Sequence, residues 1–198
     1  MDLKGKKVLV FGAGKSGIGA ADLLGSVGAQ TIIYDGNENL DKEAVLHKTN
    51  GTYTPEIWAG AFPEGEMESL DLVVLSPGVP TDLPLVKSFY EKGLPVWSEV
   101  ELAYRTGKGE VLAITGTNGK TTTTALLGKI MGDARESVFV VGNIGTAYTS
   151  KSLEMREDSV TVAEISSFQL ETIEQFRPKV SAILNITEDH LNRHHTME

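Results

Sequence analysis

The spacing of apolar residues switches along the whole chain between two patterns, one typical of strands and one typical of helices. Short apolar runs recur from the start, and stretches with helical spacing follow them. This order of strands and helices is typical of a parallel sheet covered by helices. The pattern therefore predicts an α/β protein.

In the first half of the chain, predicted strands and helices alternate regularly, except in one stretch without a clear pattern. We predict strands at 7–11, 31–34, 72–75 and around 96–97, and helices at 16–24, about 85–92 and 98–104. Residues 36–70 are weakly patterned, and no element is assigned there. The segment 106–109, Thr-Gly-Lys-Gly, interrupts the alternation and is the predicted domain boundary. It divides the chain into domains at 1–108 and 109–198.

The second half repeats the same alternation. We predict strands at 111–115, 138–141, 159–165 and 182–185, with helices at about 120–131 and 168–176. Little sequence follows the last strand, so either this domain is small or the chain is a piece of a longer protein. We expect an unpaired sheet edge there, and an unpaired edge favours self-association.

A glycine loop that ends in Gly-Lys-Thr follows the strand at 111–115. Its residues are Gly116, Thr117, Asn118, Gly119, Lys120, Thr121 and Thr122. Backbone N–H groups and a helix start bind phosphate oxygens, a lysine at this place reaches the outer phosphates, and a threonine hydroxyl binds Mg²⁺. The usual pattern has its first glycine where this chain has Ile114. A plain turn with a surface lysine is the alternative, but we predict a triphosphate site.

A second glycine loop lies near the amino terminus. Gly12-Ala13-Gly14-Lys15-Ser16-Gly17 follows a strand, opens a helix and is followed by Asp35 at the end of the next strand. Taken alone, this arrangement predicts NAD binding, with Asp35 on the ribose hydroxyls. Close helix-to-strand packing without a ligand is the alternative. Because a hydride-transfer enzyme does not need a triphosphate loop, the two loops together indicate two different phosphorylated ligands.

Two titratable side chains follow strands in the second half. Glu164 ends an apolar strand, and His190 follows the last strand by a few residues. Carboxyl ends of parallel strands gather at one sheet edge, so Glu164 is expected to face a Mg²⁺ held by Thr121, and His190 can converge on the same crevice. A salt-bridged Glu at the sheet rim is the alternative. A zinc site formed by His190 and His194 is disfavoured, because no HExxH pattern or cysteine accompanies it.

Composition narrows the class of partner. The 198 residues carry a formal net charge of −9 and include no cysteine. Binding to nucleic acid needs clustered Lys and Arg, which this chain lacks, and disulfide or thiol chemistry needs cysteine. No apolar run approaches the roughly 20 residues of a membrane span. We therefore expect a cytoplasmic protein with anionic small-molecule ligands.

Several longer segments, taken together, resemble the Mur ligases. Besides the triphosphate loop, these are 76–79 (SPGV), 142–145 (GNIG), 164–171 (EISSFQLE) and 184–191 (LNITEDHL). The resemblance covers the whole chain. It is strongest to the members that add D-glutamate to UDP-N-acetylmuramoyl-L-alanine in peptidoglycan synthesis.

The resemblance implies a fold and a set of sites. It implies a Rossmann-like first domain that binds the uridine nucleotide, and a truncated P-loop-type second domain that binds ATP and Mg²⁺. Lys120, Glu164 and His190 are implied as catalytic, and Thr121, Glu164 and His190 as metal-binding. The implied substrate-binding residues are Gly14, Lys15, Ser16, Asp35, Gly78 and Asn143.

Two rival functions remain at this stage. One is a ligase like folylpolyglutamate synthase, and the other is a nucleotide-binding module without catalysis. The first domain and the 166–169 segment (SSFQ) favour the Mur ligase hypothesis. Family members carry a metal-bridging carbamylated lysine and a third domain further along, so we expect the chain by itself to fold in its first domain and to be inactive as a ligase.

Overall fold

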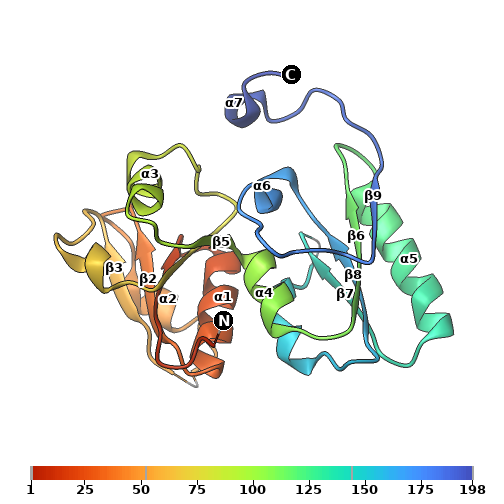
Figure 1. Cartoon of the computed structure of the whole chain (residues 1–198), viewed down its shortest axis with the longest axis horizontal. Helices are drawn as coiled ribbons and strands as arrows, with labels where there is room; N and C mark the ends of the chain where they lie inside the picture. The colour runs from red at the N-terminus through yellow and green to blue at the C-terminus, as the bar shows by residue number, and fades with distance from the viewer. Residues whose placement is uncertain (1, 52, 144, 198) are drawn as a thin grey trace.

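The computed structural model describes residues 2–51, 53–143 and 145–197. Two α/β units lie side by side along the long axis of the molecule, and the tail of the chain passes back above them (Figure 1). Both units contain a parallel sheet, as the alternating pattern predicts.

The first sheet has five parallel strands in the order β3-β2-β1-β4-β5. The strands are β1 (Lys7–Phe11), β2 (Gln30–Asp35), β3 (Glu56–Ala59), β4 (Leu72–Leu75) and β5 (Val96–Ser98). The helices are α1 (Lys15–Ser26), α2 (Lys42–Leu46), α3 (Pro84–Glu91) and α4 (Glu99–Thr106). A short 3₁₀ turn covers Glu66–Ser69.

Alternate side chains of the central strands enter different cores. Val8 and Val10 of β1 pack with Leu24 of α1, whereas Leu9 packs with Phe89 of α3. Successive side chains of a strand point to opposite faces, so a strand buried on both faces is continuously apolar. The sheet is therefore covered on both sides.

The second sheet has four parallel strands in the order β7-β8-β6-β9. These are β6 (Glu110–Thr115), β7 (Val138–Gly142), β8 (Val160–Glu164) and β9 (Val180–Ile183). The helices are α5 (Lys120–Ala134), α6 (Ser167–Leu170) and α7 (Leu191–His194), with 3₁₀ turns at Tyr148–Ser150 and Ser152–Glu154. No helix in the described part of the chain is long and apolar enough to cross a membrane.

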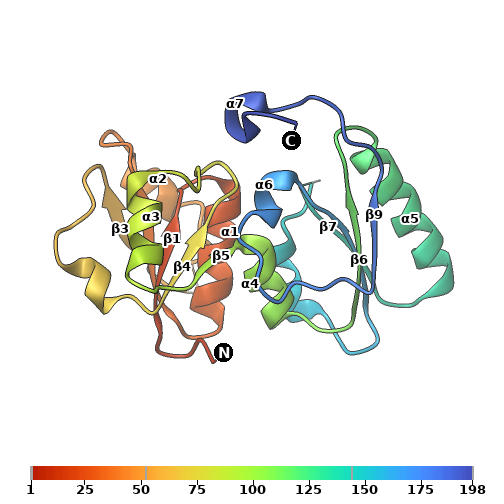
Figure 2. The same ribbon diagram turned by 45° about the horizontal axis from the view of Figure 1, so that its top comes forward.

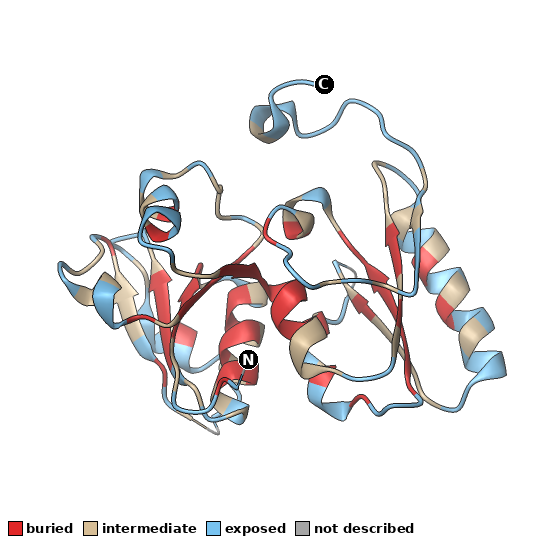
Figure 3. Ribbon diagram, viewed as in Figure 1, coloured by how far each residue is buried: buried red, intermediate tan, exposed pale blue. Residues whose placement is uncertain are grey.

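Helix α4 joins the two units. It contributes Leu102 to the core of the first unit, and Val100 and Ala103 to the core of the second. Figure 3 shows α1 and α4 largely buried at the centre of the molecule, whereas α5 is largely exposed. The predicted boundary at 106–109 follows the end of α4, and the division into 1–108 and 109–198 remains a prediction.

The predicted helix at 168–176 is wrong after its first turn. α6 ends at Leu170, and the backbone N–H groups of Glu174, Gln175 and Phe176 donate to the Glu101 carboxylate at 2.9, 2.9 and 2.8 Å. Those N–H groups are therefore used across the junction of the two units rather than in a helix.

The structure differs from the sequence prediction at three further elements, which lie at a sheet edge or in a weakly patterned region. The gap at 36–70 contains α2 and the edge strand β3, whose residues are half-buried or exposed and so form no apolar run. Strand β9 begins at Val180, two residues before the predicted strand. It lies at a sheet edge as expected, and Val180, Ile183 and Ile186 are 59, 65 and 71% exposed. Self-association through this edge remains a prediction.

Candidate functional site

The predicted triphosphate loop joins a central strand to a helix. It runs from the end of β6 to the start of α5, and Gly119 caps the helix at φ +84°. Gly116 has φ +134°, and a Cβ there would lie 3.0 Å from the Asn185 carbonyl oxygen. Side chains other than glycine are strained in this conformation. Both glycines are therefore required by the path of the loop.

Lys120 points back over the loop. Its Nζ donates to the carbonyl oxygens of Gly116 and Thr117 at 2.7 and 3.0 Å. Thr121 and Thr122 follow in the first turn of α5 with exposed side chains. The ammonium group thus lies where the loop surrounds it, as the phosphate hypothesis requires.

The segment after β9 fastens the loop, which the sequence patterns did not reveal. Asn185 accepts from the Asn118 N–H at 2.8 Å and donates to the Asn118 carbonyl oxygen at 2.9 Å. Thr117 Oγ1 donates to the Thr187 carbonyl oxygen at 3.1 Å and accepts from the Thr187 N–H at 3.0 Å. The segment 185–187 therefore holds the loop at two successive residues, Thr117 and Asn118.

Glu164 is the last residue of β8 and is 2% exposed. Its Oε1 accepts from Asn143 Nδ2 at 3.3 Å, whereas Oε2 is buried without a hydrogen-bond partner among the described residues. An unpaired buried carboxylate oxygen is costly, and hard oxygen ligands are what Mg²⁺ prefers. Glu164 therefore fits a divalent cation better than a purely structural role.

His190 lies across a cavity from the loop. It has φ +50° and opens α7, and its ring centroid lies 5.0 Å from that of Phe168. No group of three or more His, Asp or Glu within the described residues could hold a metal ion on its own. A metal shared by Thr121, Glu164 and His190 therefore remains a prediction, and phosphate oxygens would have to complete its shell.

One cavity of about 520 Å³ extends from the second unit to Pro77 of the first, but among the described residues its lining does not include the predicted substrate residues Gly14, Lys15, Ser16, Asp35 and Gly78. Figure 2 shows the tail and α7 above α6, over this region. The cavity lies between the glycine loop, α6 and the tail, and it is lined by Pro77, Thr115, Gly116, Thr117, Lys120, Asn143, Ser166, Ser167, Phe168, Leu170, Ile183, Asn185, Ile186, Thr187, Asp189, His190, Leu191, His194, Thr196 and Met197. Lys120, Asn143 and His190 are thus brought together, while Glu164 lies behind Asn143.

The amino-terminal glycine loop is built for close packing. A Cβ on Gly17 would lie 1.8 Å from the Gly12 carbonyl oxygen, so only glycine fits there. Gly14 caps α1, and Lys15 and Ser16 begin the helix. Asp35 Oδ2 accepts from the Ala13 N–H and Oδ1 from the Asn37 N–H, each at 3.0 Å. Asp35 therefore orders two loops, and its predicted role toward a ribose remains untested.

Lys15 links this loop to the second unit. Its Nζ donates to the Gly145 carbonyl oxygen at 2.7 Å, next to the segment that carries Asn143. Gly78 lies in the loop after β4, whose Pro77 lines the main cavity. The predicted substrate residues of the two units therefore lie around neighbouring loops.

Glu99 begins α4 between the two units and is 4% exposed. Burial raises the pKa of its carboxyl to about 7, although Gln169 Nε2 donates to Oε1 at 2.8 Å. Gln169 also accepts from the Ser166 N–H at 2.7 Å. A buried carboxyl group is thus connected to the cavity wall through one amide side chain.

We expect Glu99→Gln to remove a pH dependence of stability. A carboxyl whose folded pKa is about 7 costs stability as pH rises from its unfolded value of 4.5, and the cost is complete above pH 7. The variant should therefore gain about 2–3 kcal/mol in unfolding free energy relative to the wild type between pH 5 and pH 8. Urea unfolding at both pH values measures it. Equal pH dependence in both proteins would contradict the expectation.

The fold and the cavity together define a protein with a P-loop-type domain that follows a Rossmann-like domain. Residues 6–98 match the family described as Mur ligase MurD-like, N-terminal domain, and residues 114–198 match the Mur ligase middle domain. The chain belongs to the Mur ligase family.

Proteins named UDP-N-acetylmuramoylalanine--D-glutamate ligase are similar along the whole chain. Those of Lachnospira eligens and Lachnoclostridium phytofermentans are 62 and 60% identical over 198 residues, which is all of this chain and 44% of each relative. The chain therefore spans less than half the length of these relatives.

Solved structures agree with the fold. A UDP-N-acetylmuramate-alanine ligase of Thermotoga maritima is 25% identical with a TM-score of 0.53, over 96% of this chain and 44% of that one. A UDP-N-acetylmuramate:L-alanyl-gamma-D-glutamyl-meso-diaminopimelate ligase of Neisseria meningitides is 18% identical with a TM-score of 0.54, over 96% of this chain and 63% of that one. The second likeness concerns the fold alone.

Proposed function

We propose that this protein acts in the ATP-dependent addition of D-glutamate to UDP-N-acetylmuramoyl-L-alanine, a cytoplasmic step of peptidoglycan synthesis. The observation that carries the proposal is that Lys120 of the glycine loop, Asn143, His190 and Pro77 of the first unit line one cavity. The relatives that match all of the chain bear the name of this ligase. A ligase needs such a shared cavity, because ATP and the acceptor must meet.

The glycine loop and Lys120 would bind the ATP phosphates. The Lys120 ammonium would exchange its present contacts with the Gly116 and Thr117 carbonyl oxygens for phosphate oxygens, which are stronger acceptors. Thr121, Glu164 and His190 would hold Mg²⁺, which supplies charge neutralisation at the γ-phosphate when bound. The feature that supports this assignment is the buried Glu164 Oε2, which has no hydrogen-bond partner in the part of the chain that the structure describes.

The first unit would bind the uridine nucleotide. Gly14, Lys15 and Ser16 belong to its glycine loop, Asp35 accepts from the Ala13 N–H of that loop, and Gly78 lies in the loop after β4. Asn143 would contact the other end of the sugar nucleotide, because it lines the cavity beside Lys120. The acceptor carboxylate would then reach the γ-phosphate.

The residues are suited to an acyl phosphate route. A carboxylate oxygen of the acceptor would attack the γ-phosphorus and ADP would leave; the D-glutamate amine would then attack the acyl carbon, losing a proton, and phosphate would leave. Two anions must approach each other in the first step. Fixed positive groups such as Lys120 stabilise that approach, and positioning supplies much of the remaining acceleration.

A binding experiment separates this proposal from the dinucleotide hypothesis. Calorimetric titration of the chain should show binding of UDP-N-acetylmuramoyl-L-alanine and little heat with NAD, because the chain pairs the first loop with a triphosphate site. Uridine alone serves as the control for the phosphate contribution. Tight binding of NAD together with no response to the uridine nucleotide would refute the proposal.

A further inference from the structure

Arg193 lies where the tail returns to the first unit. Its guanidinium covers the Phe168 ring at 4.9 Å from the centroid and pairs with the Glu171 carboxylate at 2.6 Å. It also donates to the Val79 carbonyl oxygen at 3.1 Å, and its side chain is 14% exposed. A planar guanidinium satisfies several acceptors at once, which an ammonium does less well.

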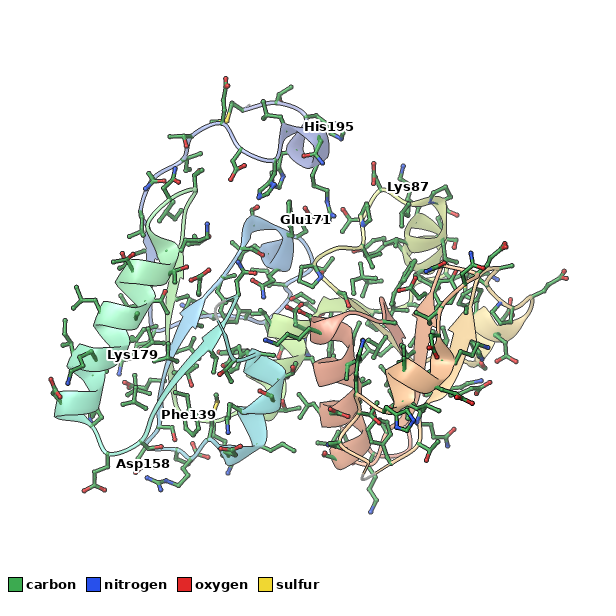
Figure 4. The ribbon with its side chains drawn as sticks, turned by 180° about the vertical axis from the view of Figure 1, so that it is seen from behind. Lys87, Phe139, Asp158, Glu171, Lys179 and His195 are labelled. Atoms are coloured by element: carbon green, nitrogen blue, oxygen red, sulfur yellow. The ribbon has the colours of Figure 1, made fainter. Side chains whose placement is uncertain are left out.

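Glu171 makes the same connection from the other side. Its Oε2 also accepts from Thr81 Oγ1 at 3.0 Å, and its side chain is 21% exposed. Figure 4 shows Glu171 at the end of α6, beneath the segment that carries His195. Arg193, Glu171, Val79 and Thr81 therefore form a contact, here termed the latch, between the tail, α6 and the loop after β4.

His190 contacts the latch through the Phe168 ring. Phe168 supports the rings of His190 and His194 at centroid distances of 5.0 and 5.3 Å, beside the Arg193 guanidinium. His194 Nε2 lies 2.9 Å from Ser167 Oγ, so the single turn α7 is held on α6 at both ends. The loop that carries Gly78 and the turn that carries His190 are thus fixed to each other.

We infer that Arg193 is a positioning residue that sets the distance between the two ends of the acceptor-binding site. The inference rests on the proposed function, in which the uridine diphosphate end lies at the amino-terminal glycine loop and the loop after β4, and the carboxylate end lies at Asn143, beside the Mg²⁺ that His190 would help to hold. A ligand that touches both ends gains affinity only when their separation matches its length. UDP, which reaches one end alone, gains nothing from the latch.

The test compares these two ligands. In calorimetric titration, Arg193→Ala should weaken binding of UDP-N-acetylmuramoyl-L-alanine about tenfold and change UDP binding less than twofold. Arg156→Ala is the control, because Arg156 pairs with the neighbouring Asp158 and its side chain is 61% exposed. It should change neither affinity. Glu171→Ala added to Arg193→Ala should weaken binding by less than the two single effects combined, because the two side chains share one ion pair.

Other outcomes of this titration would contradict the inference or the proposed function. Equal weakening of both ligands would indicate a local effect on the loop after β4 and would overturn it, as would no change in either. Failure of the wild-type chain to bind either ligand would instead refute the proposed function, and the inference with it. Hydrogen exchange tests the latch without ligand: Arg193→Ala should increase exchange at 79–83 and at 190–195 together. An increase confined to 190–195 would also overturn the inference.

Discussion

Replacing Lys120 with alanine should weaken binding of Mg²⁺·ATP by the chain more than tenfold. The ammonium is part-buried and surrounded by the loop, where its donors meet the Gly116 and Thr117 carbonyl oxygens. A charge-assisted hydrogen bond of this kind is worth about 1.5–3 kcal/mol, which corresponds to roughly a 10- to 150-fold loss of affinity. Calorimetric titration with a non-hydrolysable ATP analogue measures it.

The matched control is Lys129→Ala on the same helix. Lys129 is 75% exposed and pairs with Asp133, so its loss should leave affinity unchanged. Glu164→Ala should act through the metal. The affinity of this variant for the ATP analogue should therefore depend less on Mg²⁺ than the affinity of the wild type. If affinity is the same with Mg²⁺ and with EDTA, and Lys120→Ala does not reduce it, the phosphate site is wrongly assigned.

Local patterns predict the buried parts of the fold well. The predicted bounds of β1 and β4 agree with the structure, because both strands are covered on two faces and are therefore continuously apolar. β3 was missed, because an edge strand with half-buried side chains has no such run. The capping box of Ser166 and Gln169 marks the start of α6, but nothing local marks its early end.

The residues of the candidate site likewise fall into those that local patterns predict and those that depend on tertiary packing. The glycine loop and the end of β8 place Lys120 and Glu164 at one sheet edge, which follows from chain order and parallel topology, whereas His190 lies across the cavity at the start of α7. The pairing of Asn185 with Asn118 depends on β9 lying beside β6, and the reach of Arg193 to Val79 depends on the packing of the two units. Such contacts join segments far apart in the sequence, so no local pattern contains them.

Glu101 should be the most costly single carboxylate to remove. It is fully buried and accepts three backbone N–H groups from 174–176 together with the Arg105 guanidinium. Burial alone would raise the pKa of this carboxyl, but these donors outweigh burial and lower it. Its stabilisation is therefore present above the unfolded pKa near 4.5 and lost as pH falls through the folded value.

We expect Glu101→Ala to reduce the free energy of unfolding by about 3–5 kcal/mol near neutral pH, because it leaves buried N–H groups and a guanidinium unpaired. Total stabilities are only about 5–15 kcal/mol, so the two units should separate or unfold at low urea. Glu101→Gln should fall between, since its single amide oxygen accepts fewer bonds. Glu154→Ala, which removes an exposed pair with Lys151, should cost under about 1 kcal/mol. Equal losses in Glu101→Ala and Glu154→Ala would show that the 174–176 turn is held by other contacts.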